Sequence, residues 1–228
     1  MKLSVIIPVF NEKNSIQNIV KKVEDIDIDK EIILIDDYSN DGTVEIIKND
    51  INGENIKKLF HKKNLGKGAA VRTGIKHISG DIVIIQDADM EYDPTDYHAL
   101  IGPIVRGDAD VVYGSRLSGG APQRVHMFWH LMGNKMLSFI TNIMYNTTLT
   151  DMETGYKVFR ADVIKNLNLK SNRFEIEPEI TAKIFKQKLR VYELPISYYG
   201  RSYEEGKKIT WKDGFTALWT ILKYRFVD

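Results

Sequence analysis

The stretch Asp81-Ile82-Val83-Ile84-Ile85-Gln86-Asp87-Ala88-Asp89 predicts a β-strand that is buried on both faces and ends in a pair of aspartates. A short run rich in Ile and Val is typical of a central strand in a parallel sheet. Open α/β sheets bind their ligands at the carboxyl edge, where Asp87 and Asp89 are expected. Two neighbouring carboxylates repel each other unless a cation lies beside them, and Mg²⁺ or Mn²⁺ is the natural candidate. A polar loop that caps a helix starting at Asp93-Pro94 is the simpler alternative.

Strand-like and helix-like patterns alternate through the first half of the chain. Strands are expected at residues 3–10, 31–35, 57–61, 81–86 and 110–114, and helices at 16–23, 43–48, 68–77 and 94–106. This alternation predicts an α/β fold with one mostly parallel, Rossmann-like sheet and right-handed crossovers. The second half predicts a helix over 179–187, a strand over 190–199 and a helix over 209–226. Because no linker is rich in Pro, Gly or Ser, we expect one domain over residues 1–228.

The composition of the chain excludes several classes of protein. Of the 228 residues 43% are apolar, which is enough for a substantial core, and the net charge of +1 gives no field that would attract nucleic acid. The absence of cysteine excludes disulfides and thiolate metal sites, and it is compatible with a cytoplasmic protein. No uninterrupted apolar stretch is long enough to span a bilayer.

Polar residues follow each predicted strand of the first half. They are Asn11 and Glu12, then Asp36, Asp37, Ser39 and Asp41, then Asn64, Gly66, Lys67 and Gly68, then Asp87 and Asp89, and last Ser115 and Arg116. Because parallel strands end at one edge, these groups are expected to converge on a crevice that suits a nucleoside diphosphate and its metal. The simpler alternatives are that Asp41 caps a helix, Gly66 and Gly68 only form a turn, and Arg116 makes a surface ion pair. Neither a P-loop nor a Gly-x-Gly-x-x-Gly motif follows the first strand.

The order of these motifs resembles the family 2 glycosyltransferases of the GT-A fold. The resemblance rests on Ser4 to Glu12, Ile35 to Thr43, Asn64 to Gly68 and Gln86 to Asp89. Three further segments resemble the dolichol- or polyprenyl-phosphate sugar synthases: Tyr113 to Arg116, Asp151 to Phe159, and Glu193 to Ile196 leading into Arg201 and Gly206-Lys207-Lys208. The resemblance divides the chain into a donor half, 1–116, and an acceptor half, 117–228.

The resemblance implies a metal-dependent, inverting hexosyltransferase of cell-envelope biogenesis. Its nucleotide-sugar site would comprise Pro8, Phe10, Glu12, Asp36, Asp37, Lys67, Gln86 and Asp87, with Mg²⁺ or Mn²⁺ held by Asp87 and Asp89. Arg116, Lys157, Arg201 and Lys207 would contact phosphates of the donor or acceptor, although the family often has Arg in place of Lys157. Asp89, Arg116 and Asp151 would be catalytic, and Asp151 is the candidate base. A lipid phosphate acceptor is already ionised and would need none; Asp151 would then position the acceptor.

The acceptor is the least defined part of this prediction. A UDP- or GDP-sugar is expected to donate to polyprenyl or dolichyl phosphate; a soluble glycan acceptor and a non-catalytic sugar-nucleotide-binding partner remain alternatives. Two apolar stretches bear on the choice, the residues 124–145 and the stripe Phe215, Leu218, Trp219, Leu222 and Phe226. Each is expected either to be a core helix or to be an amphipathic surface that contacts a membrane. The second reading places the protein peripherally at the cytoplasmic membrane face.

Overall fold

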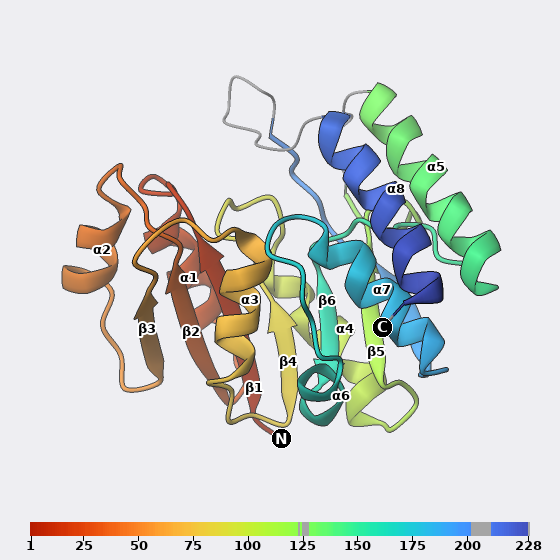
Figure 1. Ribbon diagram of the computed structural model, residues 1–228. Helices are drawn as coiled ribbons and strands as arrows, with labels where there is room; N and C mark the ends of the chain where they lie inside the picture. Colours follow the sequence, from red (N-terminus) through yellow and green to blue (C-terminus); the bar gives the residue numbers. More distant parts are fainter. Residues whose placement is uncertain (123, 125–127, 202–210, 228) are drawn as a thin grey trace.

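The computed structural model describes residues 1–122, 124, 128–201 and 211–227. In this part of the chain, one sheet of seven strands has the order β3-β2-β1-β4-β6-β5-β7 (Figure 1). The strands are β1 (Leu3–Val9), β2 (Lys30–Asp36), β3 (Ile56–Phe60), β4 (Ile82–Ile85), β5 (Val111–Ser115), β6 (Lys157–Arg160) and β7 (Val191–Pro195). Only β6 runs antiparallel to its neighbours, β4 and β5, among these strand pairs. The structure therefore confirms the expected GT-A-like, mostly parallel sheet.

Helices cover both faces of the sheet. They are α1 (Ile16–Glu24), α2 (Thr43–Asn49), α3 (Lys67–Ile75), the 3-10 turn η1 (Pro94–Asp96), α4 (Tyr97–Val105), α5 (Phe128–Tyr145), α6 (Ala161–Asn166), α7 (Ile176–Lys186) and α8 (Trp211–Phe226). Apolar residues of α1, α2 and α4 pack on one face, and those of α3, α6 and α7 pack on the other. Helices α5 and α8 lie against α7 as an outer layer and rise past the edge of the sheet (Figure 1).

The central strands are apolar on both faces because each face is covered by helices. In β1, Val5 and Ile7 belong to the core beneath α1 and α4, while Ile6 faces the core beneath α3. All three side chains are fully buried. This two-sided burial explains why the strands read as continuous apolar runs rather than as alternating patterns.

Strand β6 and helix α6 were not predicted. The strand is four residues long, begins with Lys157 and ends with Arg160, and so lacks the apolar run that marks the other central strands. It nevertheless lies between β4 and β5, and the Lys157 side chain is fully buried. The buried charge of Lys157 is tolerated because Glu177 of α7 forms an ion pair with it. Short-range sequence patterns do not reveal such a partner.

The strand order reverses beside β1. The chain proceeds from β1 to β2 and β3 on one side, and β4 then pairs with β1 on the other side. Such a switch point is where open α/β sheets bind ligands. Three non-glycine residues with positive φ, namely Asn11, Tyr38 and Met90, lie in the loops that follow β1, β2 and β4. Because β1, β2 and β4 are parallel, these three loops lie at the same edge of the sheet.

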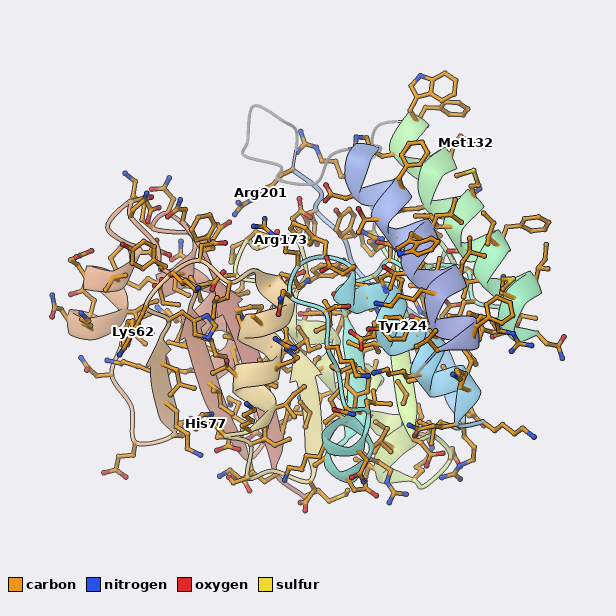
Figure 2. The ribbon with its side chains drawn as sticks, viewed as in Figure 1. Lys62, His77, Met132, Arg173, Arg201 and Tyr224 are labelled. Atoms are coloured by element: carbon orange, nitrogen blue, oxygen red, sulfur yellow. The ribbon has the colours of Figure 1, made fainter. Side chains whose placement is uncertain are left out.

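Helices α5 and α8 expose large apolar side chains instead of burying them. We define the α5–α8 apolar face as Phe128, Trp129, Met132, Met136, Phe139, Ile143, Phe215, Trp219 and Phe226, each of which is exposed. Figure 2 shows Met132 on the outer side of α5. The buried side of α8 carries Ala217, Ile221 and Tyr224. The core reading of the stripe through Phe215, Trp219 and Phe226 is therefore wrong, and residues 128–145 form a single half-buried helix.

A membrane-spanning helix would need a long, uniformly apolar segment. Among the helices that the structure describes, none meets that requirement.

Candidate active site

A cavity of about 1060 Å³ opens at the carboxyl edge of the sheet. Its walls come from the loops after β1, β4 and β5, from the beginnings of α3 and α7, and from α5 and α8. The predicted site residues that line it are Pro8, Phe10, Glu12, Asp37, Lys67, Asp87, Asp89, Arg116 and Arg201. The structure thus brings together residues that are far apart in the chain: Arg201 donates a hydrogen bond to Glu12, which lies 189 positions before it.

Four predicted site residues do not line the cavity, and Lys207 falls outside the described residues. The four are Asp36, Gln86, Asp151 and Lys157. Gln86 is fully buried, accepts hydrogen bonds from the hydroxyls of Tyr97 and Tyr156, and donates to the carbonyl of Asp87. Gln86 therefore orients the pair of aspartates, Asp87 and Asp89, and does not face a ligand. Asp36 is buried as well, and accepts a hydrogen bond from the backbone N–H of Ser39.

The two carboxylates of the Asp87–Asp89 dyad have different surroundings. Asp87 forms an ion pair with Lys67, with 2.7 Å between Oδ1 and Nζ. Asp89 has no cation in an ion pair with it among the described residues, and accepts a hydrogen bond from the backbone N–H of Glu91. Burial is the main cause that raises the pKa of Asp89 to about 7; the Asp87 and Glu91 carboxylates act in the same direction, and the charge of Arg201 opposes them. Asp89 thus has no ion-paired cation within the described structure.

Lys67 belongs to a buried chain of alternating charges that joins the two halves of the molecule. Its Nζ lies 3.2 Å from Oε1 of Glu177, whose Oε2 contacts Lys157. Burial alone lowers the pKa of Lys67, but the Asp87 and Glu177 carboxylates outweigh burial and raise it. The ammonium of Lys67 therefore stays charged beside the dyad. It is held there by a chain of ion pairs that runs from Lys157 through Glu177 and Lys67 to Asp87. These ion pairs also explain why Lys157 does not reach the cavity: its charge is used to hold Glu177.

Arg116 and Asp151 form a bidentate ion pair at the end of β5. Nε and Nη2 of Arg116 donate to the two carboxylate oxygens at 2.7 and 2.8 Å, and the backbone N–H of Arg116 donates as well. The side chain of Asp151 is 0% exposed. Asp151 was predicted to act as a base or to position the acceptor; in this structure both of its carboxylate oxygens accept from Arg116, and it does not line the cavity. Asp151 instead fixes the guanidinium of Arg116, whose cavity-side surface lies over the ring of Tyr198.

The loops at the ends of β1 and β2 form a polar pocket at the other end of the cavity. Asp37 accepts hydrogen bonds from the backbone N–H groups of Leu65 and Gly66, and its Oδ1 lies 2.7 Å from Nδ1 of His61. Glu12 lies 3.1 Å from Arg201. Both acids therefore have structural partners as well as a surface on the cavity, and Asp37 ties the Gly66–Lys67 turn to the end of β2.

The cavity-lining residues without a role assigned from the sequence include Glu153, Arg173 and Glu177. Glu153 stands within the motif Asp151 to Phe159 but lacks a sequence pattern of its own. Glu177 lies in the first turn of α7, where an acid is expected simply to complement the helix dipole. The Arg173 side chain forms no ion pair with a carboxylate among the described residues. Figure 2 shows Arg173 and Arg201 above the edge of the sheet.

A mostly parallel α/β sheet with an acidic dyad at its switch point and an outer layer of two helices fits a glycosyltransferase of the GT-A fold. The chain belongs to glycosyl transferase family 2, whose model matches residues 4–167. The matched region contains the dyad, Lys67, Arg116 and Glu153. The remaining part of the chain, which includes Glu177 and α8, is outside the matched region.

Two curated relatives and one solved structure illustrate the similarity. The chain is 30% identical to a UDP-N-acetylglucosamine–dolichyl-phosphate N-acetylglucosaminyltransferase of Methanococcus voltae, over 96% of this chain and 94% of the relative. It is 28% identical to the low-salt glycan biosynthesis hexosyltransferase Agl6 of Haloferax volcanii, over 99% of this chain and 53% of the relative. Glucosyl-3-phosphoglycerate synthase of Mycobacterium tuberculosis, in complex with Mn²⁺, UDP and glucosyl-3-phosphoglycerate, superimposes with a TM-score of 0.74 at 17% identity. That match covers 100% of this chain and 81% of the other and concerns the fold.

Proposed function

We propose that this protein is a metal-dependent, inverting glycosyltransferase that moves a hexose or N-acetylhexosamine from a UDP-sugar to polyprenyl or dolichyl phosphate. One observation carries the proposal: the cavity that contains the acidic dyad is also walled by apolar side chains of α5 and α8. The relative from Methanococcus voltae, named for UDP-N-acetylglucosamine and dolichyl phosphate, supports this choice of donor and acceptor. A GDP-sugar is the second choice of donor.

The dyad fits a divalent cation that is shared with a diphosphate. Asp87 and Asp89 provide hard carboxylate oxygens, and the mutual repulsion of the Asp87, Asp89 and Glu91 carboxylates favours a cation beside Asp89. No group of three or more His, Asp or Glu side chains in the described structure could hold a metal ion. Mg²⁺ is commonly held by one or two carboxylates together with phosphate oxygens, so two protein ligands are sufficient. When bound, such a cation would supply Lewis-acid stabilisation to the leaving diphosphate.

The residues around the dyad place positive charge where negative charge develops. As the sugar leaves, charge builds on the β-phosphate, and fixed cations aimed at that position lower the barrier. Lys67 provides one such cation, because Asp87 and Glu177 hold its ammonium at the dyad. Arg116 provides a second, fixed by Asp151. Both groups are set in place before the donor binds, so little reorganisation accompanies the reaction.

The acceptor side of the cavity suits an amphiphilic phosphate. A phosphate monoester is ionised near neutral pH and attacks without a general base, which agrees with the locked geometry of Asp151. Arg173 offers a guanidinium that has no carboxylate partner among the described residues. The apolar part of the wall contains Leu131 and Leu137 of α5 and Leu218 of α8. These side chains would contact the first isoprene units. A soluble sugar acceptor would have no use for this apolar wall.

The test is transfer of radiolabel from UDP-N-acetylglucosamine, UDP-glucose and GDP-mannose to polyprenyl phosphate, with Mn²⁺ or Mg²⁺. The proposal predicts label in the organic phase with a UDP-sugar only when the cation and the lipid phosphate are both present. Label that remains in the aqueous phase on a glycan would favour a soluble acceptor. Donor binding without transfer to any acceptor would favour a non-catalytic binding partner.

We expect the α5–α8 apolar face to bind membranes, with anionic lipid increasing the affinity. Helix α5 contains no acidic residue, and the exposed Lys135, Lys223 and Arg225 flank the face. The double variant Phe139→Ser/Trp219→Ser, which changes two side chains outside the cavity, should lower partitioning into anionic vesicles by at least about tenfold in a flotation assay. The matched control is Tyr192→Ser, which removes an exposed aromatic from β7. Equal flotation of all three proteins, or no flotation of the wild type, would contradict the membrane contact.

A further inference from the structure

The wall of the cavity carries a carboxyl group with an unused oxygen. Glu153 lines the cavity, and its Oε1 is buried without a hydrogen-bond partner among the described residues. Buried polar atoms without a partner are rare in folded proteins, and each requires an explanation. Burial raises the pKa of Glu153 to about 7, with Lys157 opposing the effect. The cost of keeping this group without a partner is explained if a bound ligand supplies the missing hydrogen bond.

The backbone around Glu153 is held rigidly, so its side chain is presented in a defined place. The Glu193 carboxylate accepts from the N–H groups of Thr150 and Asp151, Ser138 Oγ accepts from the N–H of Met152, and the Tyr92 hydroxyl accepts from the N–H of Gly155. These distances are 2.8–3.1 Å. A functional group that is fixed by its supporting contacts in this way is typical of a preorganised binding site.

The position of Glu153 along the sheet edge corresponds to the sugar of a bound donor. The edge runs from the pocket at β2 and β1, with Asp37 and Glu12, through the dyad after β4, to the segment before β6 that contains Glu153. A nucleoside in the first pocket and a diphosphate at the dyad leave the sugar facing β6. Gly155, two residues after Glu153, approaches the Asp87 carboxylate so closely that a Cβ there would collide with it.

The chemistry of a carboxyl group also favours the sugar over the other parts of the substrates. A carboxylate repels phosphate oxygens, whereas it accepts strong, charge-assisted hydrogen bonds from hydroxyl or amide groups. A site that hydrogen-bonds a particular substrate group discriminates strongly against analogues that lack it, because its own polar atom would then be left without a partner.

We propose that Glu153 accepts a hydrogen bond from a hydroxyl or amide group of the transferred sugar and thereby contributes to the choice of sugar. This inference rests on the proposed function, since it requires a nucleotide-sugar donor. It assigns to Glu153 a contact with the sugar alone, separate from the cation, the nucleoside and the acceptor.

Calorimetric titration of UDP, UDP-glucose and UDP-N-acetylglucosamine in the presence of Mn²⁺, without acceptor, tests the assignment. Wild type, Glu153→Ala and Glu153→Gln are compared. For the preferred sugar, the ratio of the Kd for UDP to the Kd for the UDP-sugar should fall by about tenfold in Glu153→Ala. The fall should be smaller in Glu153→Gln, which keeps an oxygen acceptor. The affinity for UDP should stay the same in all three proteins.

The thermal unfolding of the same proteins excludes a merely structural role. Because Oε1 has no partner to lose, Glu153→Gln should leave Tm unchanged or raise it.

Three results would overturn the inference. The first is a lower Tm together with an equal loss of affinity for UDP and for the UDP-sugar. The second is an unchanged ratio of the two affinities, and the third is a loss of turnover in Glu153→Gln at unchanged donor affinity. A wild type that binds no nucleotide or nucleotide sugar would overturn the proposed function and this inference together. Binding without transfer to the lipid would contradict the acceptor proposal alone.

Discussion

Replacing Asp89 with Asn is expected to lower sugar transfer by about a thousandfold while leaving the protein folded. The variant keeps the shape of the side chain and removes the carboxylate that has no cation partner in the described structure. Removal of one group that stabilises transition-state charge typically reduces turnover by about 10²–10³-fold. Stability should be preserved or increased, because Asp87 and Glu91 repel the charge that is removed. Initial rates of label transfer at saturating donor, with thermal unfolding of both proteins, measure the two effects.

Asp108→Asn is the matched control for this variant. Asp108 is an exposed carboxylate whose partner is the exposed Arg106, and such pairs contribute little to stability. Its substitution should change neither turnover nor Tm. Asp87 is a less suitable target, because its loss would also remove one of the two carboxylate partners of Lys67. Turnover of Asp89→Asn within a few-fold of wild type would show that the cation is bound elsewhere or is not needed.

Replacing Asp151 with Ala is expected to lower the free energy of unfolding by about 3–5 kcal/mol, because it leaves a buried guanidinium without its partner. Arg116 is only 13% exposed, and Asp151 supplies both of its charged contacts. Transfer should fall as well, since Arg116 would no longer be fixed at the cavity. Urea unfolding followed by circular dichroism gives the stability, and label transfer below the unfolding transition gives the activity.

The double variant Arg116→Met/Asp151→Leu separates the structural role from the catalytic one. Replacing both members of a buried ion pair by apolar residues is often neutral or stabilising. The double variant should therefore recover most of the stability that Asp151→Ala loses, and it should remain inactive. Turnover of the double variant close to that of wild type would contradict the role of Arg116 in stabilising the leaving group.

Local sequence patterns were sufficient to predict most of the sheet. Strands β1, β2 and β4 are buried on both faces, so their apolar runs are unambiguous. The polar residues that follow them were correctly expected at one edge, because the direction of parallel strands fixes where their ends lie. Strand β6 escaped prediction because its apolar centre is only two residues long, flanked by Lys157 and Arg160, and its place in the sheet depends on long-range pairing.

The candidate site was predictable in composition but not in its internal pairing. The sequence indicated that Asp87, Asp89, Lys67 and Arg116 would gather, and they do line one cavity. It could not show that Asp151 would be enclosed by Arg116, since the two are 35 residues apart. Partnership across such distances is decided by tertiary packing, which local spacing does not encode.

The outward side of α8 shows a second limit of pattern reading. The stripe through Phe215 and Trp219 has the spacing of a buried helix face, yet both side chains are exposed. Smaller residues on the opposite side, Ala217 and Ile221, make the core contacts. Periodicity identifies an apolar stripe but does not identify what covers it.

Calorimetric titration of UDP into wild type and Asp89→Asn, each with Mn²⁺ and with a chelator, tests the central claim most directly. If the dyad grips a diphosphate through a cation, chelation should weaken UDP binding to the wild type by at least about tenfold. In Asp89→Asn the affinity should be low and should no longer respond to Mn²⁺. Equal affinity of the wild type for UDP with and without the cation would contradict the account.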